Sequence, residues 1–215
     1  MCGLYAKGQV TVSIRAGFNA SKVAWKETRN GSTIKNRFNP GYQLGMTTDI
    51  PITLNRYPLT LQTGLLYSTK GYRQRYDDGT GPGILCINPY YVELPLNILY
   101  NIPGDIERFF IGAGGYFAYG IGGQWVMKYN GGGWNNGTIE YTDISDQNPN
   151  DNQFNYGRRT DLGINLLAGM NIGPSLYLQL NGQIGLRNIA PLENKKVTSE
   201  EFRNMGINVA IGCHL

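Results

Sequence analysis

A strict alternation of polar and apolar residues near the start of the chain constrains the fold more than any other sequence feature. In residues 9 to 19, QVTVSIRAGFN, every second side chain is apolar, while the intervening positions are polar or small. A period of two is typical of a β-strand whose two faces meet different environments. The deciding question for this chain is which of the two faces meets water.

The same alternation returns seven more times and predicts an all-β protein. The expected strands cover residues 9–19, 41–50, 59–69, 90–100, 109–121, 160–170, 176–187 and 205–215. The most apolar run, residues 109–123, is shorter than the roughly 20 residues that a membrane-spanning helix needs. A spanning helix is therefore excluded, whereas strands of about 9 to 11 residues are long enough to cross a bilayer.

The connections between these strands alternate between short and long. Short links with turn residues are expected at residues 53–58, 101–107 and 171–175. Long polar links are expected at residues 20–39, 70–88, 122–158 and 188–203. One rim therefore carries turns and the other carries loops. We expect an antiparallel up-and-down meander of eight strands that closes into a barrel, because closure removes unpaired sheet edges.

Residues 9–215 are expected to form this barrel as a single domain, since a barrel of this length need not be divided. Residues 1–8 precede the first strand and place Ala6 and Gly8 where a signal peptidase prefers small residues. We therefore interpret residues 1–8 as the remnant of a signal peptide, and a frayed tail is the alternative.

The composition of the two strand faces indicates which face contacts water. Only 16% of the residues are charged, and the apolar face is almost free of charge across the middle of every strand. The outer surface of a soluble barrel normally carries many Lys and Glu residues. The sequence therefore predicts a transmembrane barrel with its apolar face towards lipid and mainly Gly, Asn, Gln, Thr and Ser inside. A soluble, lipocalin-like ligand-binding barrel is the inverse arrangement and stays as an alternative.

Five ionisable residues fall on the inward face of the predicted strands: Arg15, Asp49, Glu93, Asp161 and Arg187. The interior of an eight-stranded barrel is just wide enough for side chains to fill it, so a wide channel is not expected. Buried charges persist when they are paired. We therefore expect Arg15 and Arg187 each to find a carboxylate within a hydrogen-bonded polar network, and a narrow gated ion path is the alternative role for this network.

Several segments also resemble a known family. LLYSTKGY (residues 65–72), VELPL (residues 92–96), DLGINLLAGM (residues 161–170) and GINVAIGCHL (residues 206–215) are similar to PorT-like outer-membrane β-barrel domain proteins of Gram-negative bacteria. The resemblance spans roughly residues 9–215. It implies an eight-stranded outer-membrane barrel of the type often labelled "porin family", with short periplasmic turns and long extracellular loops. It also implies a role as a component of a protein secretion apparatus.

The sequence offers no motif for catalysis, a cofactor or a metal. His214 is the only histidine, and no Ser or Asp is spaced to suggest a triad with it. The three separated cysteines give neither a disulfide framework nor a metal quartet. The formal charge of +4 is too small to indicate nucleic-acid binding. We therefore expect a non-enzymatic protein without cofactors.

The first long link is rich in basic residues, which are Lys22, Lys26, Arg29, Lys35 and Arg37. Just outside an outer membrane, such side chains are expected to pair with lipopolysaccharide phosphates, and a solvated charge run is the alternative. The leading hypothesis is a monomeric outer-membrane barrel that acts as a structural or interaction module through its extracellular loops. A secretion component with a protein partner and a narrow pore are the other candidates.

Overall fold

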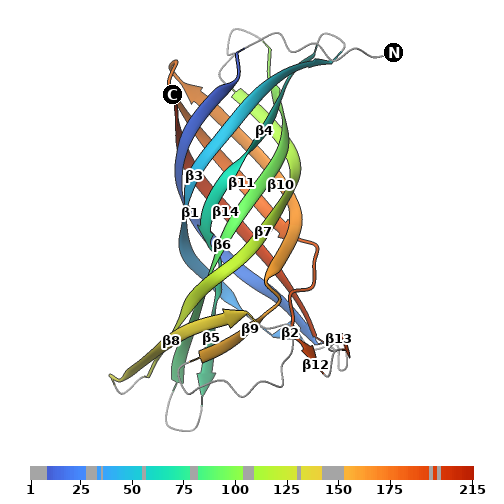
Figure 1. Ribbon diagram of the computed structural model, residues 1–215. Helices are drawn as coiled ribbons and strands as arrows, with labels where there is room; N and C mark the ends of the chain where they lie inside the picture. The colour runs from blue at the N-terminus through green and yellow to red at the C-terminus, as the bar shows by residue number, and fades with distance from the viewer. Residues whose placement is uncertain are drawn as a thin grey trace.

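Eight long strands form a closed ring in the computed structural model (Figure 1). They are β1 (Thr11–Glu27), β3 (Arg37–Leu54), β4 (Tyr57–Thr69), β6 (Pro82–Asn101), β7 (Phe109–Lys128), β10 (Thr160–Ile172), β11 (Leu176–Gly185) and β14 (Glu200–His214). Each strand pairs antiparallel with the next in this order, and β14 returns to pair with β1. The predicted eight-stranded up-and-down barrel is confirmed.

The structure describes residues 9–27, 33–34, 36–54, 57–77, 82–103, 109–129, 132–141, 153–193, 196–197 and 200–215. The predicted signal-peptide remnant, residues 1–8, lies outside the described residues. Within the described part of the chain, no helix is long and apolar enough to cross a membrane.

Six short strands gather at the end of the barrel opposite the C-terminus (Figure 1). They are β2 (Thr33–Ile34), β5 (Tyr72–Asp77), β8 (Trp134–Tyr141), β9 (Gln153–Gly157), β12 (Leu192–Glu193) and β13 (Lys196–Val197). β5 and β8 pair with the outer parts of β6 and β7, and β9 joins β8 in parallel. The predicted long loops at 20–39, 70–88 and 122–158 are therefore in part regular sheet, which corrects the sequence interpretation.

The burial of side chains shows which face of each strand points outward and which points into the barrel. Large apolar side chains are exposed on the outside of every long strand, as at Ile14, Leu44, Leu65, Leu96, Ile111, Leu166, Leu180 and Val209. Ile14 keeps 48% of its surface exposed, whereas its neighbour Arg15 keeps 2%. A continuous apolar exterior needs lipid around it. This arrangement is the inverse of a lipocalin-like barrel, in which the apolar set would fill the inside.

On the inner surface of the barrel, aromatic rings pack over glycines of the neighbouring strand. Tyr177 lies opposite Gly212, Tyr116 opposite Gly163, and Phe110 opposite Gly169 on neighbouring strands. A Cβ atom added to any of these glycines would overlap the facing ring. The glycines of the inward face therefore provide space for aromatic side chains, and this packing narrows the barrel interior.

A β-bulge in β7 marks the boundary between the barrel and the sheet formed by the short strands. Tyr91 pairs with Gly120 and Tyr90 with Gly122, so Ile121 has no residue opposite it. Gly122 has a φ of 141°, a conformation that favours glycine. The extra residue shifts the phase of the alternation. As a result, Trp125 turns inward and is buried, although odd-numbered residues face outward earlier in β7.

Candidate functional site

An ion cluster occupies the middle of the barrel. The Lys70 ammonium lies 3.2 Å from a Glu93 oxygen and 4.0 Å from an Asp161 oxygen, and all three side chains are buried. Its Nζ also lies 4.1 Å from the centre of the Tyr116 ring. Gln183 donates a hydrogen bond to Glu93 over 3.1 Å. One ammonium thus faces two carboxylates in a setting that water hardly reaches.

The Asp161 carboxylate accepts hydrogen bonds from two neutral side chains. Asn204 donates to its Oδ2 over 2.8 Å and the Tyr116 hydroxyl over 3.1 Å. Tyr116 comes from β7, which pairs with the strand of Asp161, β10, and Asn204 comes from β14, which lies one strand further along the wall, beyond β11. Hydrogen bonds to a carboxylate stabilise its charged form, so the cluster is held by amide and hydroxyl groups as well as by Lys70.

Lys70 is an interior cation that the sequence analysis missed, because it placed residue 70 at the start of a loop. Ser68, Lys70 and Tyr72 all face inward and are buried, so the inward phase continues past the end of β4. The inward-facing residues of β4 have even numbers and end at Ser68, so extending this alternation by two residues predicts Lys70 inside the barrel.

Arg187, by contrast, was wrongly assigned to the interior. β11 ends at Gly185, and Arg187 is exposed on a bend that follows the strand. Its backbone N–H donates to the Leu162 carbonyl over 3.2 Å, as does that of Leu186 over 2.8 Å. These two bonds to one carbonyl replace the regular ladder, so the alternation does not carry on to residue 187.

Arg15 is fully enclosed but does not form the expected ion pair. Its guanidinium donates to the Asn208 amide oxygen over 2.9 Å, and among the described residues no carboxylate lies within 4.0 Å of it. Glu93 and Asp49 act on it electrostatically from farther away. The expected pairing of Arg15 with a carboxylate is therefore wrong, because an amide from β14 takes the near position.

The lumen between these groups is filled. Asn165 donates to Asn97 over 3.0 Å, and Asn97 to Gln62 over 3.5 Å, which links three strands across the interior. The cavity beside Lys70 and Tyr116 measures about 10 Å³, roughly the space of one water molecule. The described side chains leave no continuous wide channel at this level.

An apolar core closes the barrel towards the short strands. Its buried members are Val23, Tyr72, Ile87, Tyr91, Tyr116, Ala118, Trp125, Ile139, Tyr156 and Ile189. Burial raises the pKa of the Tyr156 and Tyr141 phenols, which belong to the short strands β9 and β8 at this end of the barrel. This part of the molecule therefore resembles the interior of a folded domain rather than the mouth of a pore.

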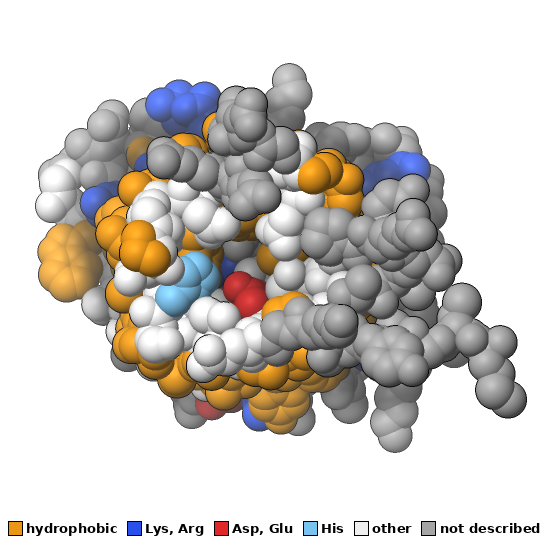
Figure 2. Space-filling view, turned by 90° about the horizontal axis from the view of Figure 1, so that it is seen from above, with side chains coloured by type: hydrophobic (Ala, Val, Ile, Leu, Met, Phe, Trp, Pro, Cys, Tyr) orange, Lys and Arg blue, Asp and Glu red, His pale blue; other side chains and the backbone are white. Residues whose placement is uncertain are grey.

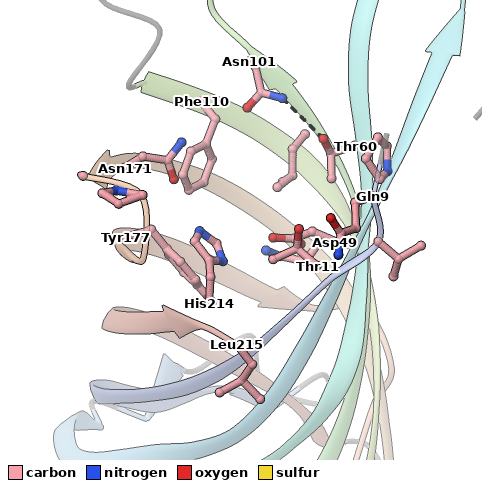
Figure 3. Close-up of a pocket in the computed structure, with 16 residues that line it drawn as sticks. Gln9, Thr11, Asp49, Thr60, Asn101, Phe110, Asn171, Tyr177, His214 and Leu215 are labelled. Carbon is pink, nitrogen blue, oxygen red and sulfur yellow. Dashed lines mark hydrogen bonds between the residues drawn. The ribbon is translucent and has the colours of Figure 1, made fainter. Parts of the chain in front are cut away.

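The opposite end of the barrel is open and hollow. A cavity of about 970 Å³, here called the vestibule, lies at the end with the short turns. Figure 2 looks into it and shows acidic (red) and imidazole (pale blue) groups inside the hollow. Asp49 and Thr11 lie on one side, and Phe110 and Tyr177 on the other (Figure 3). The vestibule thus has a polar wall that faces an aromatic wall.

His214 lies at the rim of the vestibule and forms a serine–histidine pair that the sequence analysis did not anticipate. The Ser13 hydroxyl and His214 Nδ1 are 2.8 Å apart, and the imidazole packs against the Tyr177 ring with centroids 5.2 Å apart. Ser13 has no exposed surface. A nucleophile must reach its substrate, so this pair is suited to holding β1 against β14 rather than to attack.

Within the described residues, no group of three metal-binding side chains converges. The basic residues predicted to face lipopolysaccharide are divided. Lys22 and Lys26 continue β1 and Arg37 opens β3, whereas Arg29 and Lys35 lie outside the described residues. The Lys22 ammonium lies 5.0 Å from the centre of the Phe38 ring, at the outer edge of the apolar belt.

A closed ring of eight strands with an apolar exterior and a filled polar interior defines an integral membrane β-barrel. The chain matches the family model "Outer membrane protein beta-barrel domain" over residues 6–190, and it belongs to this family. The protein is therefore a bacterial outer-membrane barrel. Outer-membrane barrels have short periplasmic turns and longer extracellular loops. By this rule the vestibule, at the end with the short turns, opens to the periplasm, and the short strands lie on the extracellular side.

Two solved outer-membrane barrels are similar to this chain. Ail, the attachment invasion locus protein of Yersinia pestis, shares 12% identity at a TM-score of 0.44, covering 97% of this chain and 100% of Ail. Neisserial surface protein A shares 9% identity at a TM-score of 0.44, covering 98% of each chain. The chain has no match among curated protein sequences.

Proposed function

We propose that this protein is a monomeric, non-enzymatic outer-membrane barrel that carries a rigid extracellular sheet as an interaction module and does not conduct solutes. The observation that carries the proposal is the apolar core that joins the sheet to the barrel and closes the lumen at that end. Such a core fixes the sheet relative to the membrane. A fixed surface binds without the entropy cost of ordering a loose loop.

Two rows on the outward face of this sheet carry basic and aromatic side chains, and the exposed Glu140 lies further along β8. Across β5, β6, β7 and β8, the register places Arg75, Ile84, Lys128 and Trp134 side by side in one row. Arg73, Cys86, Val126 and Asn136 form the next row towards the membrane. The described side chains in these two rows include three cations and no acid. Trp134 is 68% exposed.

The chemistry of this face suits a phosphorylated glycolipid. Arg and Lys side chains bind phosphate oxygens by charge-assisted hydrogen bonds, and an exposed Trp packs on sugar or acyl groups. Lipopolysaccharide is the anionic lipid that surrounds an outer-membrane barrel on this side. We therefore extend the predicted lipopolysaccharide contact from its described residues, Lys22, Lys26 and Arg37, to Arg73, Arg75 and Lys128.

The test measures lipopolysaccharide retained by the purified barrel. The triple variant Arg73→Gln, Arg75→Gln, Lys128→Gln is expected to retain several-fold less than the wild type. The matched comparison uses dephosphorylated lipopolysaccharide, which both proteins should retain equally weakly. Equal retention of phosphorylated lipopolysaccharide by wild type and variant would contradict the phosphate contact.

Two alternatives are separated by further measurements. A narrow pore predicts stable conductance steps in planar bilayers, and none are expected from a filled lumen. A PorT-like role in secretion predicts a protein partner, and the feature that favours it is the hollow periplasmic end. Cross-linking from the vestibule rim and, separately, from Trp134 in intact cells shows which end of the barrel meets a partner.

A further inference from the structure

The vestibule holds an acidic group whose charge is not matched nearby. Asp49 lines the cavity, and among the described residues no basic group lies within 4.0 Å of its carboxylate. Its Oδ1 is buried without a hydrogen-bond partner, while Gln62 supports the carboxylate from β4. An uncompensated carboxylate at low solvent exposure favours the approach of a cation.

The rest of the lining is consistent with a cationic guest. Among the described residues that line the cavity there is no Lys or Arg, and Asp49 is the acidic one. The basic groups that act electrostatically on Asp49 are the imidazole of His214 and the enclosed guanidinium of Arg15. The guanidinium is already bonded to Asn208, and the imidazole Nδ1 to Ser13.

The aromatic wall strengthens the effect of the Asp49 charge. Tyr177 and Phe110 lie across the cavity from Asp49 (Figure 3), with ring centroids 6.4 Å apart and planes inclined by 69°. Both rings are buried, at 2% and 5% exposure, so they form an apolar wall that lowers the local dielectric constant and strengthens the attraction between Asp49 and a cation. Side-chain oxygens of Thr60, Asn101 and Asn171 provide further acceptors around the opening.

We propose that the vestibule is a periplasmic binding site for an organic ammonium or guanidinium group, with Asp49 as the counter-charge and Tyr177 and Phe110 as the aromatic wall. The group belongs either to a free polyamine or to a Lys or Arg side chain presented by a periplasmic protein. The site lies at the opposite end of the barrel from the extracellular sheet, so it stands or fails independently of the proposed surface function.

The experiment uses the full chain in phospholipid nanodiscs, where both ends are accessible, with spermidine and the blocked tripeptide Gly-Lys-Gly as probes. Calorimetry and amide chemical shifts of Thr60, Asn101 and Gly173 report binding. Asp49→Asn is expected to weaken the affinity about tenfold or more, since a hydrogen bond to a charged partner is lost. The control Glu201→Gln removes one negative charge at the extracellular end and should change the affinity less than about twofold.

The outcomes are distinct. Binding of spermidine alone identifies a polyamine, and binding of the lysine tripeptide but not of Gly-Gln-Gly identifies a protein side chain. Either result supports the proposal when Asp49→Asn weakens the binding about tenfold or more. Equal binding of a neutral hexose, or equal effects of Asp49→Asn and Glu201→Gln, overturns it and leaves the vestibule as a hydrated mouth. Slower gel migration of the boiled sample verifies that each variant is folded.

Discussion

At the scale of single residues, the interior charges decide how tightly the barrel is held. Lys70 is the only described basic group in contact with Glu93 and Asp161, and both of these are buried with it. Burying a pair of charges gains little on balance, but removing one partner leaves the other uncompensated. The cluster is therefore a point at which a single substitution has a large effect.

Lys70→Met is expected to lower the free energy of unfolding by about 3 to 5 kcal/mol, because two carboxylates then lose their cation. Lys22→Met, at the outer edge of the apolar belt, should change it by less than about 1 kcal/mol. Urea unfolding of the lipid-reconstituted barrel measures both. Adding Glu93→Gln to Lys70→Met should recover part of the loss, and no recovery would contradict the pairing.

The sequence identified some of these residues and missed others for a physical reason. Arg15, Glu93 and Asp161 follow from alternation, because the inward phase is unbroken at each of them. The partner of Arg15 could not be predicted, since Asn208 lies 193 positions away and reaches it only when the barrel closes. Arg187 was wrongly predicted to face inward because the alternation of residue types does not show where the hydrogen-bonded pairing of a strand ends.

At the scale of strands, the outer belt and the inner face obey different rules. Ile14 meets lipid, whereas Thr11 lines the aqueous vestibule three residues earlier. Ile14→Arg is expected to destabilise the barrel by about 2 to 4 kcal/mol, because it places a cation in the hydrocarbon layer. Thr11→Asn should cost much less. Equal costs in the same unfolding assay would count against the orientation of the wall.

The ring-over-glycine packing gives a second test at this scale. A Cβ on Gly163 would overlap the Ile184 carbonyl and the Tyr116 ring, whereas one on Gly115 would come no closer than 3.4 Å to a neighbour. Gly163→Ala is therefore expected to cost about 1 to 3 kcal/mol of stability, and Gly115→Ala clearly less. A similar loss for both variants, measured by urea unfolding, would show that the ring moves aside freely.

The strands themselves were predictable within the membrane but not beyond it. In lipid, one face must be apolar and the other polar, so the pattern is regular. Beyond the bulge at Ile121, on the side of the short strands, water meets the outer face and an apolar core the inner one. In β7 the phase shifts by one residue, so Trp125 faces inward, whereas Ile87 continues the unbroken inward phase of β6. The sequence had predicted only polar loops for both segments.

At the scale of the whole molecule, the two ends of the barrel are unlike. The extracellular end is sealed by a protein core, and the periplasmic end holds a cavity of about 970 Å³. The closed ring leaves none of its eight strands without a neighbour on either side. This closure makes cooperative unfolding the expected behaviour.

The unboiled protein is expected to migrate faster than the boiled protein on a detergent gel, because the closed barrel stays compact until it is heated. It should also require detergent or lipid to stay monodisperse, since its exterior is apolar. A sample that remains monodisperse in plain buffer would contradict the assignment of the outer face.

The shared core also affects how the protein can be engineered for surface display. Tyr91 and Tyr116 belong to the core beneath the sheet and also lie over the Lys70 ammonium within the barrel. Cutting away the outer strands would therefore unpack the spanning region. Foreign peptides are better grafted at the tip between Tyr129 and Trp134, where the side chains on both sides are solvated and no core contact is lost.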